Sequence, residues 1–308
     1  MIDLSGLQAL GAVRMHGSVV GAAEALGFTP SAVSQQLKKL ERQTGTPVLE
    51  RYGRGVVLTE HGRRLAERGA ALLASMEALE ADVLAASAQV QGRVRLAAFS
   101  TAVRGLVAPL LQRVAADGVP LEVSVHEQDP REALGLVATG QVDLALVHTW
   151  GDTVLPMPEH VESHLVGVDV ADILVPIGHP LAGRGQVTPL DLRHEVFASG
   201  PVGSVCHQWL TRMFGQVGGP PPVAFWVAEF SSHIALVDRG VALSLTPRLG
   251  RETLPSGVAV VTVADPVPTR DISLVWRRSM GTSPNLGYLR AVLDELAPAL
   301  GLSAASPG

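Results

Sequence analysis

The chain has 308 residues, and its 24 Lys and Arg against 29 Asp and Glu give a net charge of −5. A composition of 47% hydrophobic and 17% charged residues excludes a disordered chain, and a single cysteine excludes an internal disulfide. The N-terminus "MIDLSGLQAL" has no basic segment before a long apolar core, and apolar runs elsewhere are short. We therefore expect a cytoplasmic globular protein of two or three domains, without a signal peptide or membrane contact.

Positive charge is concentrated at one end of the chain. Residues 1–68 contain nine Lys and Arg against six Asp and Glu, whereas residues 92–308 contain fifteen against twenty. A protein that binds DNA needs cations only where it contacts the phosphates. The N-terminal segment is therefore the expected contact with double-stranded DNA.

Three short helices are predicted in this basic segment. Apolar residues at positions 4, 7, 10 and 13 predict the first, and Ser18 can cap a second helix that ends at Gly27. In "TPSAVSQQLKKLE", residues 29–41, Thr29 can act as the N-cap, and Pro30 suits the first turn of a third helix. The second and third helices, joined by a tight turn, are typical of a helix-turn-helix unit.

The third helix has an apolar face for packing and a polar face of hydroxyl, amide and cationic groups. Such groups read base edges and bind phosphates, so we expect Gln35 and Ser34 to contact bases and Lys38 to contact phosphate. The alternative is an ordinary amphipathic helix with a solvated basic face. The candidate DNA-binding residues of this helix are Thr29, Pro30, Ser31, Ser34, Gln35 and Lys38.

A basic β-hairpin is predicted directly after these helices. "PVLERYGRGVVLTEHG", residues 47–62, reads as two short strands around the turn Gly53-Arg54-Gly55. Helix-turn-helix followed by such a hairpin is a winged helix-turn-helix domain, with the third helix in the major groove. Arg51 and Arg54 are the candidate DNA contacts of the hairpin. A basic hairpin beside the third helix favours DNA binding over an ordinary amphipathic helix with a solvated basic face.

One long helix is predicted from Thr59 to about Gln89. Its apolar residues alternate in steps of four and three over about four repeats, which is a heptad seam. Pairing with a second copy is favoured over packing on the helix's own domain, because that domain is too small to cover the seam. The candidate dimerisation residues are Leu65, Leu72, Met76, Leu79 and Val83.

The stretch "LQALGAVRMHGSVVGAAEALGFTPSAVSQQLKKLERQTGTPVLERYGRGVVLTEHG" resembles the N-terminal domain of LysR-type transcriptional regulators over nearly its full length. Thr29 replaces the usual serine, and Val48-Leu49 stands where Leu-Phe is common. "HPLAGRGQVTPLDL", residues 179–192, resembles the segment that opens the second lobe of that family's effector domain. The resemblance implies a sequence-specific regulator, modulated by a small-molecule effector such as a metabolite, that acts as a homodimer or homotetramer.

Strands alternate with helices in the C-terminal part, which predicts an α/β domain with parallel sheets. The helix–Gly–strand pattern of residues 136–147 recurs at 236–247, which indicates two lobes like those of periplasmic binding proteins. We expect a winged helix-turn-helix domain at 1–58, a linker and dimerisation helix at 59–90 and an effector domain at 91–301. Lobe 1 would take about 92–166 and 268–300, lobe 2 about 167–267, and residues 302–308 would form a disordered tail.

Ligands in open α/β sheets bind beyond the carboxyl ends of the strands. Ser and Thr at these positions are also common helix caps, so each residue alone has a structural alternative. The candidate effector-binding residues are Ser100, Thr101, Glu127, Gln128, His148, Thr149, Ser199, Gly200, Glu229, Phe230 and Thr246.

Other functions have weaker support. The sequence contains no hydrolase, dinucleotide, P-loop or HExxH motif, so we expect neither an enzyme nor a cofactor. His160 and His164 in "HVESH" are a weak metal candidate, because a loop is expected there. Cys206 has no resolving cysteine and is expected to be a buried structural residue. A solute-binding receptor would share the two lobes, but it would require export and gain nothing from a basic winged helix.

Overall fold

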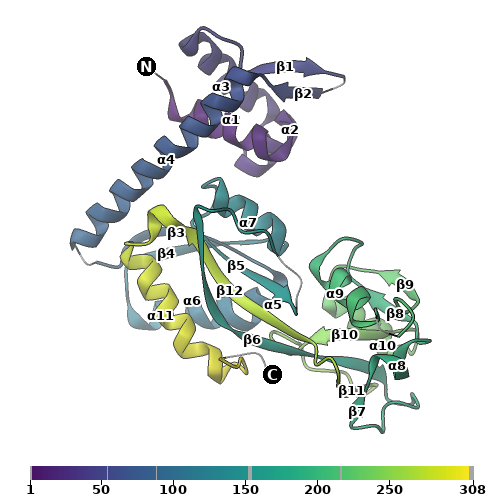
Figure 1. The fold of residues 1–308 in the computed structure, drawn as a ribbon. Coiled ribbons are helices and arrows are strands. Elements are labelled where there is room, and N and C mark those ends of the chain that lie inside the picture. Colours follow the sequence, from purple (N-terminus) through teal and green to yellow (C-terminus); the bar gives the residue numbers. More distant parts are fainter. Residues whose placement is uncertain (1, 54, 88, 152–154, 216, 305–308) are drawn as a thin grey trace.

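The computed structural model consists of a small helical domain, one long helix and a two-lobed α/β domain (Figure 1). The structure describes residues 2–53, 55–87, 89–151, 155–215 and 217–304.

The N-terminal domain begins with three short helices whose ends are fixed by local signals. The side chains of Asp3, Ser18 and Thr29 each accept a hydrogen bond from a backbone N–H in the first turn of the helix that follows. Each helix ends at a glycine in the left-handed conformation. The elements of this domain are α1 (Leu4–His16), α2 (Val19–Leu26), α3 (Pro30–Thr44), β1 (Leu49–Tyr52) and β2 (Gly55–Leu58).

Helix α4 (Glu60–Ser87) links this domain to the α/β domain. Its first turns pack on α1, and Leu65 and Leu73 join the core of the N-terminal domain. Further along, α4 crosses the gap between the two domains and meets the α/β domain near η2 (Arg278–Met280) and α11 (Pro284–Ala299).

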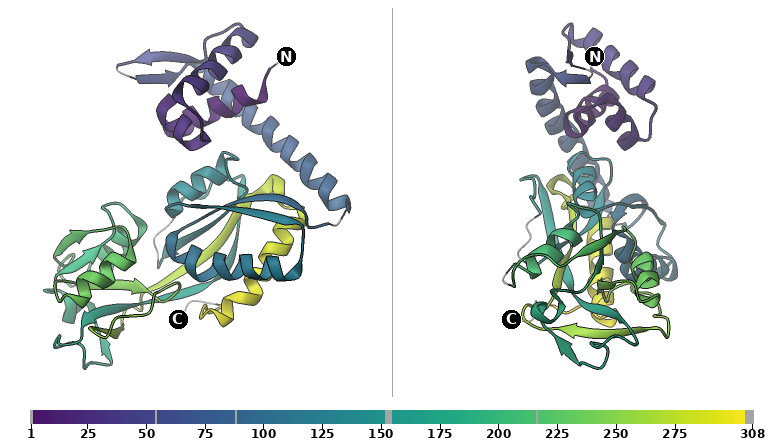
Figure 2. Two further views of the ribbon diagram at one scale, coloured as in Figure 1. Left: turned by 180° about the vertical axis from the view of Figure 1, so that it is seen from behind. Right: turned by 90° about the vertical axis from the view of Figure 1, so that its right-hand side faces the viewer.

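Lobe 1 of the α/β domain is a sheet covered by helices on both faces (Figure 2). Helices α6 and α11 pack on one face and α7 on the other. In this lobe β3, β4 and β5 are parallel, and β12 runs antiparallel to β5. The elements are β3 (Gly92–Ala98), α5 (Ser100–Ala102), η1 (Val103–Val107), α6 (Ala108–Asp117), β4 (Leu121–Glu127), α7 (Pro130–Ala138), β5 (Leu144–Trp150) and β12 (Thr269–Arg277).

Lobe 2 repeats this plan around a parallel set of three strands, β10, β8 and β9. Its core is formed mainly by Ile173, Phe197, Leu210 and Phe214. The elements are β7 (Gln186–Val187), α8 (Pro189–Leu192), β8 (Phe197–Ser199), α9 (Val205–Met213), β9 (Val223–Trp226), α10 (Phe230–Asp238), β10 (Leu243–Pro247) and β11 (Val258–Val263).

The long strand β6 (Val161–Pro176) belongs to both lobes. Up to Val170 it pairs with β12, and from Ala171 onward it pairs with β10 and β11. The lobe boundary on this strand therefore falls about three residues after the expected crossing at Gly167, because the strand does not break where its partners change. The return crossing precedes β12, next to the expected Pro268.

The expectation of a disordered tail from residue 302 is wrong for its first two residues. Leu302 is buried, and Ser303 exchanges backbone hydrogen bonds with Val168 of β6. The close fit depends on Gly167, because a Cβ at that position would lie 2.8 Å from the Cβ of Leu302. Apolar contact thus orders the chain past α11, and residues 305–308 of the expected tail lie outside the described residues.

Candidate functional site

Helix α3 presents a polar face to solvent. Ser31, Gln35 and Lys38 are exposed, while Val33, Leu37 and Leu40 on the other side are fully buried. The burial fixes the orientation of the helix, so the exposed face is held rigidly for contact with another molecule.

Two hydroxyls of the candidate DNA-binding set are already used inside α3. The Thr29 hydroxyl accepts a hydrogen bond from the Ala32 N–H at 3.2 Å, and the Ser34 hydroxyl donates to the Pro30 carbonyl at 2.8 Å. The Thr29 hydroxyl also lies 2.9 Å from that of Ser31, so these two hydroxyls share a hydrogen bond, and the Ser34 hydroxyl has no proton left to donate. Gln35 and Lys38 are therefore the better-placed donors on this face.

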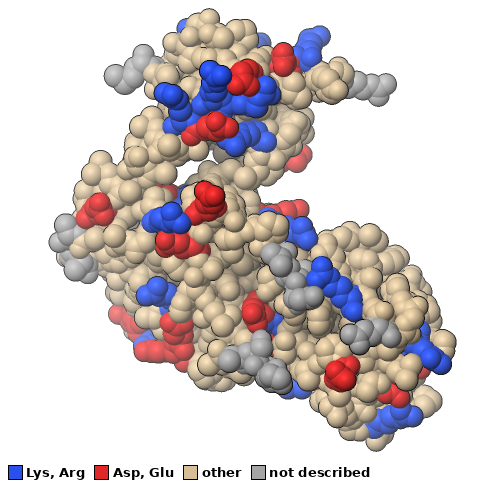
Figure 3. Space-filling view, viewed as in Figure 1, with Lys and Arg blue, Asp and Glu red and all other residues tan. Residues whose placement is uncertain are grey.

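Charged side chains crowd the N-terminal domain, where cations and acids lie side by side (Figure 3). Lys39 is paired with Asp3, and this ion pair lowers the pKa of Asp3 to about 2. Arg51 is exposed on β1, at the hairpin. Arg54, the other expected contact of the hairpin, lies outside the described residues.

At the junction of the two lobes, a buried arginine joins two strands and a short helix. The Arg270 side chain is 1% exposed, and its Nη2 lies 2.8 Å from a carboxylate oxygen of Asp169 on β6. The same Nη2 donates to the Thr101 hydroxyl at 2.9 Å. The second Asp169 oxygen accepts from the Leu249 N–H at 3.0 Å. This network ties α5 to β12, β6 and the segment after β10.

Aromatic rings surround this network. The Arg270 guanidinium lies 5.1 Å from the ring centre of Phe99 and 5.4 Å from that of Trp150. Trp150 from lobe 1 lies parallel to Trp209 from lobe 2, with ring centres 6.2 Å apart. His148 packs edge-on against Phe99, and burial together with the Arg270 charge lowers its pKa well below the usual value. His148 is therefore neutral at pH 7.

A small cavity of ≈ 20 Å³ opens beside this aromatic group, between the lobes. Its size is that of a single water molecule. Two buried polar atoms in the same aromatic group, His148 Nδ1 and Trp209 Nε1, have no hydrogen-bond partner among the described residues. The residues that line the cavity are Trp150, Ala198, Ser199, Gly200, Cys206, Leu210, Phe230, His233 and Leu245.

Some of the expected effector-binding residues lie at the cavity between the lobes. Ser199, Gly200 and Phe230 line the cavity. Thr246 reaches it indirectly, since its hydroxyl lies 3.1 Å from that of Ser244, which in turn lies 2.8 Å from His233 Nδ1.

Lobe 1 adds two further members of the set. Thr101 holds Arg270, and His148 packs among the aromatic rings. Ser100 is half-buried at the first position of α5, where no side chain caps the helix.

Four expected residues lie elsewhere. Glu127 ends β4, the outermost strand of the sheet, and Gln128 follows it. Thr149 points to the face of β5 opposite His148 and Trp150, because side chains alternate along a strand. Glu229 is exposed before α10. Sequence order located the strand ends, but it did not show which ends meet.

The central pair of this site, Arg270 and Asp169, was missed in the sequence. Both residues lie inside strands whose other residues are mostly apolar, "VGVDVADILV" and "RDISLVW". A charged residue within a buried strand requires a buried partner, and this signal could have identified both residues. It would not have paired them, since they are 101 positions apart.

Replacement of Thr101 by Val should lower the free energy of unfolding by about 1–3 kcal/mol, because a buried N–H of Arg270 loses an acceptor. Thr101→Ser keeps the hydroxyl and is the matched control. Urea unfolding of the three proteins measures the effect. Equal stability of Thr101→Val and Thr101→Ser would show that the Arg270 contact contributes nothing.

The candidate metal site of His160 and His164 gains no support from the structure. His164 lies within strand β6, where its Nε2 contacts Asp294 at 2.7 Å, and His160 contacts the Ala138 carbonyl. The expected loop is thus a turn at His160 followed by an extended strand at His164, and the two rings contact different partners. Among the described residues, no group of three or more His, Cys, Asp or Glu is placed to hold a metal ion, and no helix is long and apolar enough to cross a membrane.

The candidate dimerisation residues fall into two groups. Leu72, Met76, Leu79 and Val83 form an exposed apolar stripe along α4, between 38% and 65% exposed. Leu65 instead packs into the core of its own N-terminal domain. The stripe begins where that domain ends.

Comparison with known proteins identifies the families that the two domains match. Residues 4–63 match the model of the bacterial regulatory helix-turn-helix protein, lysR family, and residues 87–300 match the LysR substrate binding domain. A probable hydrogen peroxide-inducible genes activator of Streptomyces viridosporus is 30% identical over 298 residues, 95% of this chain and 94% of the relative. A RuBisCO operon transcriptional regulator of Allochromatium vinosum is 29% identical over 304 residues, 96% and 97% of the two chains.

A solved structure of full-length OxyR from Pseudomonas aeruginosa, a point variant, has the same fold. Its TM-score is 0.72 at 17% identity, and the match covers 100% of this chain and 99% of that one.

The chain belongs to the LysR family of transcription regulators. It is a DNA-binding regulator, not an enzyme, and its C-terminal domain binds an effector. Its partners are operator DNA, a small-molecule effector and further copies of itself. The comparisons give no support to a solute-binding receptor.

Proposed function

We propose that α3 contacts operator bases through Gln35 and phosphate through Lys38. We further propose that the protein is cytoplasmic. The observation that carries the proposal for α3 is the exposed polar face of a helix whose opposite face is buried. Ser31 lies on the same face, and Arg51 would extend the contact along the hairpin. The groups left free on this face match those that read the major groove.

Gln35→Ala should cost about 1–3 kcal/mol of operator binding and relax the sequence preference, because a bidentate base contact is lost. Lys38→Ala should weaken operator and random DNA equally and lower the salt slope by about one unit. Lys39→Ala is the matched control, since Lys39 is paired with Asp3. Titration of a duplex selected by the wild-type protein from random DNA measures each effect. An unchanged ratio of operator to random affinity in Gln35→Ala would show that another face reads the bases.

We propose that the effector binds between the lobes, at the cavity lined by Trp150, Ser199 and Phe230. Unpaired buried polar atoms cost about 1–3 kcal/mol each, and a ligand that bonds them recovers this energy. His148 and Trp209, whose rings pack against Trp150 of the cavity lining, supply two such atoms from opposite lobes. Because the space holds only about one water, a larger effector would require the lobes to separate about β6 and β12, their shared strands.

We further propose that two copies pair through the stripe of Leu72, Met76, Leu79 and Val83. Soluble proteins rarely leave a long contiguous apolar stripe uncovered, and these residues repeat with heptad spacing. Each copy would then contribute one α3 to a two-part operator.

The name of the Streptomyces relative raises the question of a peroxide response. Cys206 lines the interlobe cavity, which favours such a role, but burial raises the pKa of its thiol. The thiolate is the reactive form, so this shift slows oxidation. The sequence also has no second cysteine to form an internal disulfide. Reversible binding of an effector is therefore the function that the site supports best.

A further inference from the structure

Glu77 attaches the linker helix α4 to the α/β domain of the same chain. Its carboxylate accepts hydrogen bonds from Arg277 Nε at 2.7 and 2.9 Å, from Arg277 Nη2 and from the Ser279 hydroxyl. A second contact, Thr282 to Asp82 at 3.1 Å, lies near the end of α4. Glu77 lies on the side of α4 away from the apolar stripe, so a partner helix would leave these bonds undisturbed.

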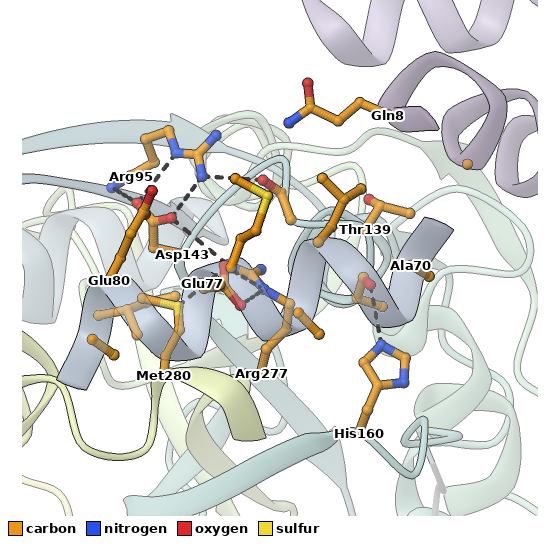
Figure 4. A pocket seen from close by; sticks show the side chains of 18 of the residues that line it. Gln8, Ala70, Glu77, Glu80, Arg95, Thr139, Asp143, His160, Arg277 and Met280 are labelled. Carbon is orange, nitrogen blue, oxygen red and sulfur yellow. Dashed lines mark hydrogen bonds and ion pairs between the residues drawn. The ribbon is translucent and has the colours of Figure 1, made fainter. Parts of the chain in front are cut away.

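Arg277 is buried and satisfied on every side (Figure 4). Its Nη1 donates to the carbonyl of Val137 in the last turn of α7 and to that of Val142, shortly before β5. Asp143 lies 3.7 Å from its Nη2 and is itself paired with Arg95. We call Glu77, Arg277, Asp143 and Arg95 the linker cluster; it contains two cations and two anions, so it is neutral.

The linker cluster lies on the floor of the groove between the two domains. This groove has a volume of ≈ 1080 Å³ and is bordered by α1 and α4 on one side and by lobe 1 on the other. The N-terminal domain makes few contacts across it, so the angle of α4 sets where that domain lies.

Strand β12 joins the linker cluster to the interlobe site. Arg270 near one end of β12 holds Asp169 and Thr101, and Arg277 at the other end holds Glu77. Between them β12 is hydrogen-bonded to β5 on one side and β6 on the other. Strand β12 thus connects the two places physically, with one register shift against β6 between Ile272 and Ser273.

We propose that the Glu77–Arg277 pair is a positioning contact that fixes the angle of α4 on β12 and thereby the spacing of the two DNA-binding domains in a dimer. The pair would make the regulator selective for the distance between operator half-sites. This inference rests on the proposed pairing of two copies through α4. It does not depend on the identity of the effector.

Glu77→Gln tests the proposal, because it removes the charge and keeps the shape of a partly exposed side chain. Glu80→Gln, on an exposed residue one turn further along α4, is the matched control. Ser279→Ala removes one bond to Glu77 and leaves Arg277 in place. Three duplexes serve as probes: the operator selected by the wild-type protein, the same operator with base pairs inserted at its centre, and a single half-site.

We expect wild type and Glu80→Gln to prefer the selected operator over the expanded one. In Glu77→Gln this preference should fall about fivefold or more, a typical size for coupling between sites, with a smaller fall in Ser279→Ala. Half-site affinity and the dimer seen by light scattering should stay at wild-type values. An unchanged preference in Glu77→Gln would overturn the proposal, and so would an equal loss on all three duplexes. A monomeric Glu77→Gln would also overturn it, whereas a monomeric wild type would overturn the proposed dimer instead.

Discussion

Replacing Asp169 by Ala should lower the free energy of unfolding of the effector domain by about 3–5 kcal/mol. The change leaves the Arg270 guanidinium, 1% exposed, without its counter-charge, and the Leu249 N–H without its acceptor. Burying an unpaired charge costs far more than losing an exposed ion pair. Unfolding in urea, followed by circular dichroism, measures the difference.

Glu122→Ala is the control for Asp169→Ala. Glu122 forms an ion pair with Arg93 in which both side chains are about two-thirds exposed. Exposed pairs contribute about 0–1 kcal/mol. Equal losses in the two variants would mean that Arg270 finds another partner, and the interlobe network would lose its structural importance.

Leu72→Glu should convert the dimer to monomers and weaken operator binding about 100-fold or more. The substitution buries a carboxylate in the apolar stripe of each copy, and the two new charges repel. A monomer engages one half-site at a time, so the gain in affinity from linking two binding domains is lost. Light scattering and operator titration measure the two effects.

Ala71→Glu adds the same charge to the neighbouring exposed residue, which lies on a different side of α4. It should leave both the dimer and operator binding intact. If Leu72→Glu keeps its oligomeric state in light scattering, the stripe does not mediate pairing.

The features predicted from the sequence are those specified by local signals. Thr29 and Pro30 start α3 because a cap and a preset φ act within one turn. The apolar repeat on α4 was predicted from its spacing alone, and Leu72 and Leu79 of this repeat are exposed in the structure. Each of these features depends on residues close together in sequence.

The contacts at the site between the lobes could not be predicted from the sequence, because they join residues that are far apart along the chain. Thr101 was expected to cap a helix or meet a ligand, yet its hydroxyl binds Arg270, 169 positions away. Thr149 was expected beside His148, but the alternation of β5 turns it to the other face. Contacts between distant strands depend on sheet order, which sequence periodicity does not specify.

The linker cluster shows the same limit. In the sequence, Glu77 is one of several charged residues on a predicted long helix, and Arg277 follows a run of strand-forming residues. Neither position indicates the other as a partner. Only the packing of α4 against η2 brings them together, 200 positions apart.

We propose that an effector bound between the lobes controls this regulator. Hydrogen–deuterium exchange of the full chain, with and without each metabolite that raises its melting temperature, tests it most directly. We predict slower exchange in residues 99–102, 148–150 and 199–206, which come from both lobes and form the cavity lining or the Arg270 network and aromatic group beside it, together with a changed operator affinity. Protection confined to one lobe, or to the groove between the domains, would contradict the claim.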